Sequence, residues 1–92
     1  MNNKEIKFYN KRLLKIDLAL ESYVDFYSEK PTKLTQLRKQ LRLFRTEKDK
    51  MTDEEKFNNC KSLVDEYTKL IDEIGKDKFE FYDDGDVICI SK

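Results

Sequence analysis

Residues 52–75, TDEEKFNNCKSLVDEYTKLIDEIG, carry the most regular pattern in the chain and decide its fold class. Apolar side chains recur there in alternating steps of three and four, at Phe57, Cys60, Val64, Tyr67, Ile71 and Ile74. Such spacing places one apolar side chain per turn on a single helix face, which a partner element has to cover. Leu63 and Leu70 widen this face beyond a coiled-coil seam. The stretch therefore predicts a helix inside a packed bundle.

The ends of this helix are also marked in the sequence. The Thr52 side chain can accept from the amide of Glu55 while the Glu55 carboxylate reaches back, which is the capping-box pattern. Asp53 and Glu54 add negative charge at the positive end of the helix dipole. Gly75 can end the helix because glycine adopts positive φ without steric cost. We expect a helix over residues 53–74.

Two further stretches show the same spacing. The first covers about residues 4–28, with apolar positions at Ile6, Tyr9, Leu13, Ile16, Leu20, Tyr23 and Tyr27. Pro31 ends it, because proline disfavours helical geometry in the residue before it and lacks an amide proton. The second covers residues 33–49 after Thr32, a suitable N-cap, with apolar positions at Leu34, Leu37, Leu41 and Phe44. Both connections are short, so consecutive helices should run antiparallel.

After Gly75 the apolar period changes from that of a helix to that of a strand. Residues 79–90 read FEFYDDGDVICI, and Asp-Gly between alternating apolar residues is a strong hairpin signal. With Asp84-Gly85 as a two-residue type I′ turn, a hairpin over about residues 78–91 places Phe79, Phe81, Ile88 and Ile90 on one face. A lone hairpin is marginal in water, so we expect that face to pack on the helices.

The expected fold is therefore mainly α: an antiparallel three-helix bundle with a C-terminal two-stranded β-hairpin packed on it. Ninety-two residues form one domain, 1–92, with a modest core. No stretch has the roughly 18 uninterrupted apolar residues of a membrane span, so no membrane partner is expected. The N-terminus lacks the apolar run of a secretory signal, and we expect a cytoplasmic protein of a bacterial host cell. The two cysteines, Cys60 and Cys89, are expected to be reduced and in or near the core.

The residue types that usually perform chemistry are scarce. The chain has no histidine, which removes the usual general base and the commonest metal ligand. Its two glycines cannot form a glycine-rich phosphate loop. The acids of the turn at residues 83–86 lack the ligand spacing of a calcium-binding EF-hand, so a solvated turn is expected. We therefore expect no catalytic residues, no metal and no cofactor.

Charge is distributed unevenly along the sequence. Residues 1–50 hold 13 basic and 7 acidic side chains, net +6, and residues 51–92 hold 6 and 12, net −6. Residues 30–45 contain six basic side chains and no acid. Arg38, Arg42 and Arg45 follow each other in steps of four and three, so they share one helix face. They could pair internally with the acids of the third helix, which are Asp65, Glu66, Asp72 and Glu73, or form an anion-recognising face.

Leu14 and Leu18 form a second unusual feature, because they lie one turn apart and away from the main apolar face. A pair of outward leucines predicts a small hydrophobic contact, with the hairpin as the favoured cover and a second subunit as the alternative. Together with the basic face they complete the candidate partner-binding residues: Arg38, Lys39, Arg42, Arg45, Lys33, Leu14 and Leu18.

No motif in the chain identifies a family. Its size and Lys/Asn/Ile-rich composition are typical of accessory proteins from low-GC bacteria and their phages. The leading hypothesis is a small non-enzymatic interaction protein that binds and blocks a bacterial protein complex through the basic helix face. A phage or mobile-element inhibitor of the anti-defence or anti-CRISPR type would act in this way. The alternatives are a nucleic-acid-binding regulatory protein, a bacteriocin-immunity-like bundle and, more remotely, a minimal enzyme; a homodimer is also considered.

Overall fold

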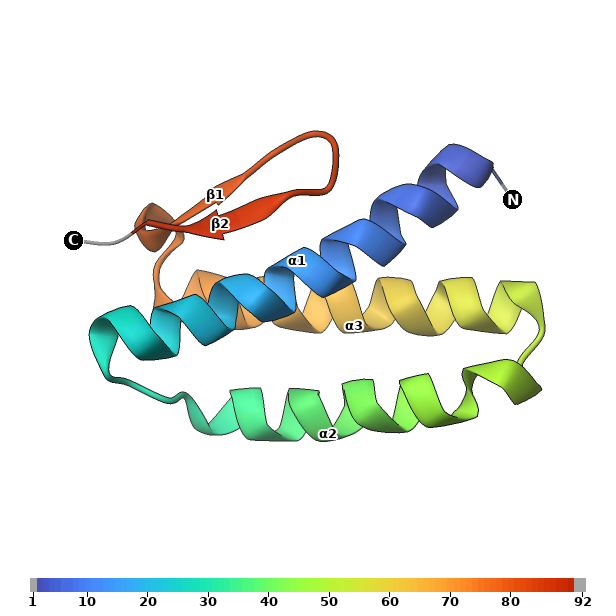
Figure 1. Cartoon of the computed structure of the whole chain (residues 1–92), viewed down its shortest axis with the longest axis horizontal. Helices are drawn as coiled ribbons and strands as arrows, with labels where there is room; N and C mark the ends of the chain where they lie inside the picture. Colours follow the sequence, from blue (N-terminus) through green and yellow to red (C-terminus); the bar gives the residue numbers. More distant parts are fainter. Residues whose placement is uncertain (1, 91–92) are drawn as a thin grey trace.

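The computed structural model describes residues 2–90 and contains three helices followed by a hairpin. The helices are α1 (Asn3–Tyr27), α2 (Thr32–Glu47) and α3 (Asp53–Ile74), and the strands are β1 (Phe79–Phe81) and β2 (Val87–Cys89). Short 3₁₀ turns η1 (Lys48–Lys50) and η2 (Lys76–Lys78) follow α2 and α3. Figure 1 shows α1 and α2 lying along α3, with the hairpin beside α1 on the side away from α2. This confirms the predicted mainly α bundle with a C-terminal hairpin; the predicted end of the hairpin at residue 91 lies outside the described residues.

The helix ends follow local sequence signals, with one exception. Thr52 accepts from the Glu55 amide at 3.2 Å, and Glu55 accepts from the Thr52 amide at 3.4 Å, so the predicted capping box is present. Gly75 follows α3 with φ 134°. The prediction that Thr32 caps α2 is wrong: Thr32 is already helical, and the N-cap is Pro31, which forms no side-chain cap hydrogen bond.

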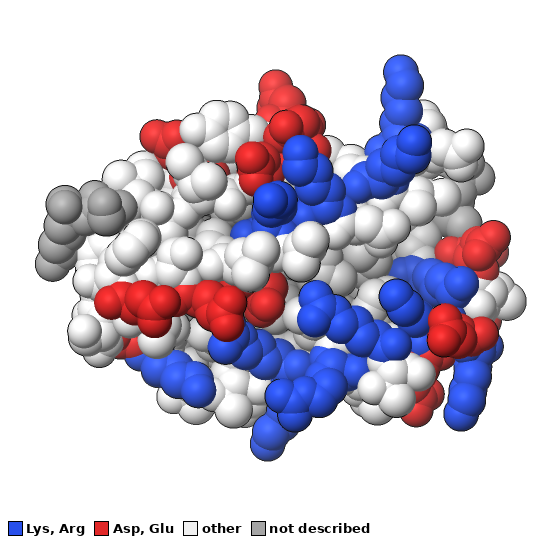
Figure 2. Space-filling view, viewed as in Figure 1, with Lys and Arg blue, Asp and Glu red and all other residues white. Residues whose placement is uncertain are grey.

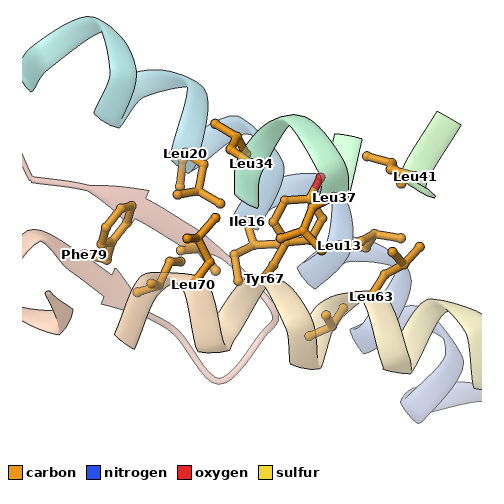
Figure 3. Close-up of a cluster of buried hydrophobic side chains, with 14 of the residues drawn as sticks. Leu13, Ile16, Leu20, Leu34, Leu37, Leu41, Leu63, Tyr67, Leu70 and Phe79 are labelled. Carbon is orange, nitrogen blue, oxygen red and sulfur yellow. The ribbon is translucent and has the colours of Figure 1, made fainter. Parts of the chain in front are cut away.

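The core is one apolar cluster to which all three helices and both strands contribute. Tyr67, Ile16, Leu20, Leu34, Ile71 and Cys60 are its most completely buried members. Figure 3 shows side chains from the three helices gathered around Tyr67, with Phe79 of β1 at one end of the cluster. The predicted apolar face of α1 is buried from Leu13 to Tyr23, whereas Ile6 and Tyr9 near the N-terminus and Tyr27 at the C-terminus are only partly covered. The N-terminal end of α1 thus lies at the edge of the bundle.

The hairpin forms, but its turn and register differ from the prediction. The observed pairs are Phe79 with Cys89, Glu80 with Ile88, and Phe81 with Val87, one residue away from the predicted register. The Tyr82 amide donates to the Asp86 carbonyl at 2.9 Å, and the Gly85 amide donates to the Tyr82 carbonyl at 3.1 Å. These bonds enclose a three-residue loop, in which Gly85 alone has positive φ, 98°. A type I′ turn would also need positive φ at Asp84, which is unfavourable for a residue with a side chain.

The shift by one residue reverses the two faces of β2. Val87 is buried with 3% of its surface exposed, whereas Ile88 is 44% exposed and Ile90 also faces outward. The predicted core face of Phe79, Phe81, Ile88 and Ile90 is therefore wrong. Phe79 is the member of that set that enters the core, where its ring stacks on Tyr23 at 5.9 Å between centroids. The hairpin consequently leaves apolar side chains of β2 on the surface.

The loop of the hairpin packs against α1. The sequence analysis expects a solvated turn here, and this expectation is wrong. Lys11 pairs with Asp84 at 3.1 Å, and Arg12 donates from Nη2 to the Tyr82 carbonyl. The Arg12 guanidinium also lies 4.8 Å from the Phe8 ring centroid and 5.2 Å from that of Phe81. Burial lowers the pKa of Arg12, while the loop acids act in the opposite direction. Basic side chains from the N-terminal half of the chain thus bind the acidic C-terminal hairpin to α1.

Gly85 of the loop lies against the backbone of α1. A Cβ atom at this position would lie 3.0 Å from the Phe8 carbonyl oxygen, in addition to occupying a positive-φ conformation. We expect Gly85→Ala to lower the free energy of unfolding by roughly 1–3 kcal/mol, because both backbone strain and contact with a rigid carbonyl oppose it. Urea denaturation followed by circular dichroism measures the change. Thr35→Ala, at an exposed position of α2, is the matched control and should alter stability by less than about 0.5 kcal/mol; equal stability of the two variants would contradict the docked loop.

Candidate partner-binding site

Arg38 and Arg45 of α2 lie beside residues of α1, and Arg38 is used inside the fold. Arg38 Nε lies 3.4 Å from Asp17 Oδ1, and Arg38 Nη2 lies 3.6 Å from Glu21 Oε1. Both acids belong to α1, so the internal partner of Arg38 is not the α3 surface named in the sequence analysis. Figure 2 shows acidic side chains along α1 beside basic side chains of α2. Arg38 is therefore a structural brace between these two helices.

Asp17 joins this brace to the third helix. The hydroxyl of Tyr67, which is completely buried, donates to Asp17 Oδ1 at 2.9 Å. Burial and the adjacent Asp17 charge raise the pKa of Tyr67, so the hydroxyl remains protonated and can donate at neutral pH. A single carboxylate thus contacts side chains from both other helices. Sequence reasoning did not single out Asp17; the available signal was its place next to Ile16 on the flank of the α1 core face.

Lys33 is the second predicted site residue that the fold uses. Its ammonium lies 2.7 Å from Glu73 Oε1 across the interface between α2 and α3. Glu73 is one of the α3 acids named as possible partners of the arginines, but its partner is Lys33. Both side chains are more than half exposed, so this ion pair contributes little to stability, about 0–1 kcal/mol.

Lys39, Arg42 and Arg45 differ from these two residues. All three are exposed, and none forms an ion pair or a side-chain hydrogen bond with any residue in the range 2–90. They occupy the C-terminal half of α2, beyond the point where Arg38 meets α1. We define these three residues as the free basic surface. It is the part of the predicted site that the fold leaves available for a partner.

A groove of about 530 Å³ adjoins the free basic surface where α1 diverges from the end of α2. Its apolar lining comes from all three helices: Ile6, Leu13, Leu14, Phe44 and Phe57. Its polar lining is Asn10, Arg45, Lys48, Asp49, Asp53 and Lys56. Arg45 belongs to both the groove and the free basic surface, and Leu14 brings a second predicted residue to the same place. The sequence analysis did not identify Phe44 and Phe57 as groove residues, because their spacing assigns them to the core.

Leu18 lies elsewhere. It lines a shallower groove of about 370 Å³ between α1 and β2, together with Phe26 and Ile88. Leu14 is 47% exposed and Leu18 is 44% exposed, so the favoured expectation that the hairpin covers both is wrong. The register of the hairpin turns Val87 of β2 into the core, and Ile88, which lines the groove beside Leu18, itself stays 44% exposed.

The described residues offer little reactive chemistry. Among residues 2–90 there is no cluster of His, Cys, Asp and Glu side chains that could hold a metal ion. Burial raises the pKa of Cys60 to about 11 and also raises that of Cys89, so both free thiols remain protonated near neutral pH. Within the same residues, no helix combines the length and apolar character needed to cross a bilayer.

Comparison with known proteins gives no match: no family model, curated protein or solved structure is detectably similar to this chain.

Charge reversal should separate the structural arginine from the free ones. We expect Arg38→Glu to lower the free energy of unfolding by roughly 2–3 kcal/mol, because it places a third carboxylate beside Asp17 and Glu21 and removes their cation. Arg42→Glu should change it by less than about 0.5 kcal/mol, because Arg42 has no ion-pair partner in the described chain. Urea denaturation of the two variants gives the comparison. Equal destabilisation would show that the two arginines do not differ in structural role.

Proposed function

We propose that this chain is a small non-enzymatic interaction protein that binds an acidic protein surface through Lys39, Arg42 and Arg45. Within α2, Arg38 and Lys33 form ion pairs with acids of α1 and α3, whereas Lys39, Arg42 and Arg45 form none among the described residues. This contrast supports the proposal. Arginine side chains present a planar fork that fits a carboxylate with two hydrogen bonds. Unpaired cations on a rigid helix are therefore available for an acidic partner.

The adjoining groove supports a protein partner in particular. Protein interfaces combine an apolar centre with a polar rim, and aromatic and arginine side chains are enriched among their strongest contacts. Phe44, Phe57 and Leu14 supply apolar surface in the groove, and Arg45 stands beside them. A segment of the partner with an apolar side chain next to a carboxylate matches this arrangement.

A protein of this kind acts by occupying a surface that another molecule needs, so its effect is to block or recruit. We propose a bacterial protein complex as the target, blocked in the manner of an anti-CRISPR or related anti-defence inhibitor encoded by a phage or mobile element; chain size and composition support this step. A bacteriocin-immunity-like protein is a variant of the same class.

Binding should depend on the free basic surface and not on total charge. The test captures proteins from a nuclease-treated lysate of a low-GC bacterium on the immobilised chain, then measures the affinity of the purified target. Arg42→Glu combined with Arg45→Glu should weaken that affinity at least tenfold, because both forks are lost. Lys4→Glu combined with Lys7→Glu makes the same net charge change on an exposed part of α1 and should change affinity by less than about twofold. Equal losses in the two double variants would contradict the assigned surface.

The same double variants distinguish a nucleic-acid partner. If the arginines contact phosphates, affinity for a labelled DNA duplex falls steeply with salt, and losing two contacts reduces the log–log slope by about 1.8. If the partner is a protein, as proposed, the double variant and the wild-type chain should show the same weak, salt-dependent binding to the duplex. Tight duplex binding that Arg42→Glu and Arg45→Glu abolish would replace the proposal with the nucleic-acid alternative.

If the chain acts by occupying a surface of its target, its effect should be stoichiometric with the target. Titration of the purified target should reach full effect at one chain per binding site, and a chelator should not change it, because the mechanism uses no metal. Intact-mass measurement of the target before and after should give the same mass. A modified target at sub-stoichiometric amounts of the chain would show turnover and overturn the non-enzymatic assignment.

A further inference from the structure

A further groove, of about 280 Å³, lies between α2 and α3 on the flank of α2 opposite Arg45. We call it the α2–α3 groove. Arg45 and Glu47 are two residues apart on α2, so they project about 200° apart around the helix axis. Arg45 lines the groove beside α1, whereas Glu47 lines the α2–α3 groove. The proposed function therefore leaves the α2–α3 groove unused.

Apolar side chains form the centre of the α2–α3 groove. Leu43 of α2 is 60% exposed, more than any other large apolar side chain among residues 2–90. Phe44, Met51 and Leu63 also line the groove. Methionine is flexible and polarisable, so Met51 can adapt its shape to an inserted side chain. The volume of the groove is below the roughly 300–1,000 Å³ of small-molecule sites, and it fits a side chain of a protein partner better.

The register of the two helices places one acid at each end of this apolar centre. α2 and α3 run antiparallel (Figure 1), and the ion pair between Lys33 and Glu73 shows which residues face each other. Counted along both helices from that pair, Glu47 of α2 faces Asn59 of α3. Glu66 lies seven residues further along α3, which is roughly 10 Å along the axis. The two acids thus lie diagonally across the groove, one on each helix.

The charged side chains of the α2–α3 groove are all acidic. Glu47 and Glu66 line it, and no lysine or arginine of residues 2–90 does so. Glu47 forms no ion pair in that part of the chain. Glu66 contacts Lys69 at 3.4 Å, but both side chains are more than half exposed, so this pair is weak. A groove whose charges share one sign attracts a segment of the opposite charge, which here is a basic one.

From the apolar centre and the two acids we propose that the α2–α3 groove binds a basic amphipathic helix of a protein partner. A large apolar side chain of that helix packs on Leu43 and Met51. A lysine or arginine one turn before it and one turn after it pairs with Glu47 and Glu66. Residues four before and four after a central residue project to its two sides and lie about 12 Å apart along the axis, which fits two acids placed diagonally.

The two flanks of α2 thus offer opposite charges to partners. A helix laid into an apolar groove is a common mode of peptide recognition, and the charges at the ends of the groove select which helix binds. Leu43, Met51, Glu47 and Glu66 do not belong to the free basic surface. This proposal and the proposed function therefore fail independently.

Peptide binding followed by amide NMR spectra tests the occupant. The probe is a synthetic helical peptide of alanine and glutamine with one central tryptophan and a lysine one turn before and one turn after it. In excess over the labelled chain, it should shift the amide signals of Leu43, Glu47 and Ser62, which line the groove. The matched peptide carries glutamate in place of both lysines and should bind about tenfold more weakly. Equal binding of the two peptides, or no shifts at the groove, would overturn the proposal.

Charge reversal on the chain tests the two acids. Glu47→Lys combined with Glu66→Lys should weaken binding of the lysine peptide about tenfold, because two ion pairs become repulsive. Asp25→Lys combined with Asp65→Lys makes the same charge change at exposed acids outside the groove and should alter affinity by less than about twofold. Glu47→Gln with Glu66→Gln should give a smaller loss without added repulsion. Circular dichroism checks that each variant is folded. Equal losses in the two lysine double variants would refute pairing with Glu47 and Glu66.

The apolar centre and the occupant are tested separately. Leu43→Ser should weaken peptide binding about fivefold, because the tryptophan loses apolar contact. Leu18→Ser, at an exposed leucine of α1 outside this groove, should leave affinity unchanged. In the chain alone, amide signals of the groove should not move as protein concentration rises. Equal effects of the two serine variants would refute the apolar contact, and concentration-dependent shifts at the groove would assign it to a second copy of the chain instead.

Discussion

The carboxylate of Asp17 is the point on which the arrangement of the three helices depends. It accepts from the buried hydroxyl of Tyr67 in α3 and faces the guanidinium of Arg38 from α2. Apolar packing is non-directional, and several rotations of a short amphipathic helix bury similar area. A polar contact is not interchangeable in this way, because a helix rotated by one residue would leave a buried hydroxyl without a partner. Asp17 thus selects one mutual orientation of the helices among those the apolar faces allow.

That orientation also decides which cations remain free. With Arg38 held against α1, Arg42 forms no ion pair in the described chain and Arg45 lines the groove where α1 and α2 diverge. Arg38, which pairs with α1, and the two arginines of the proposed binding surface therefore follow one another on the same face of α2. One rigid helix holds both, so the free arginines are presented in a fixed geometry and lose little conformational freedom on binding.

The sequence was sufficient for the helices but not for the details of the hairpin or the site. Three- and four-residue spacing defines a helix face without ambiguity, and Thr52 and Gly75 marked the limits of α3. In residues 79–90 both faces of each strand carry apolar side chains, so alternation could not distinguish two registers that differ by one residue. The loop geometry decided between them, since only Gly85 tolerates positive φ. The spacing of Arg38 and Arg42 could not predict that only Arg38 forms an ion pair, because ion pairing depends on how far each helix extends beside its neighbour.

The docked loop of the hairpin has a consequence for how the chain folds. Gly85 and Tyr82 contact α1 around Phe8 and Arg12, which are some of the longest-range contacts in sequence in the molecule. Contacts between distant segments carry the largest loop-closure cost and tend to form late. During synthesis α1, α2 and most of α3 emerge first and can associate through their own apolar faces. The stacking contact between Tyr23 and Phe79 can form only after the hairpin has been made. Because this last segment closes over helices that can already associate, we expect residues 79–90 to open more readily than the three helices.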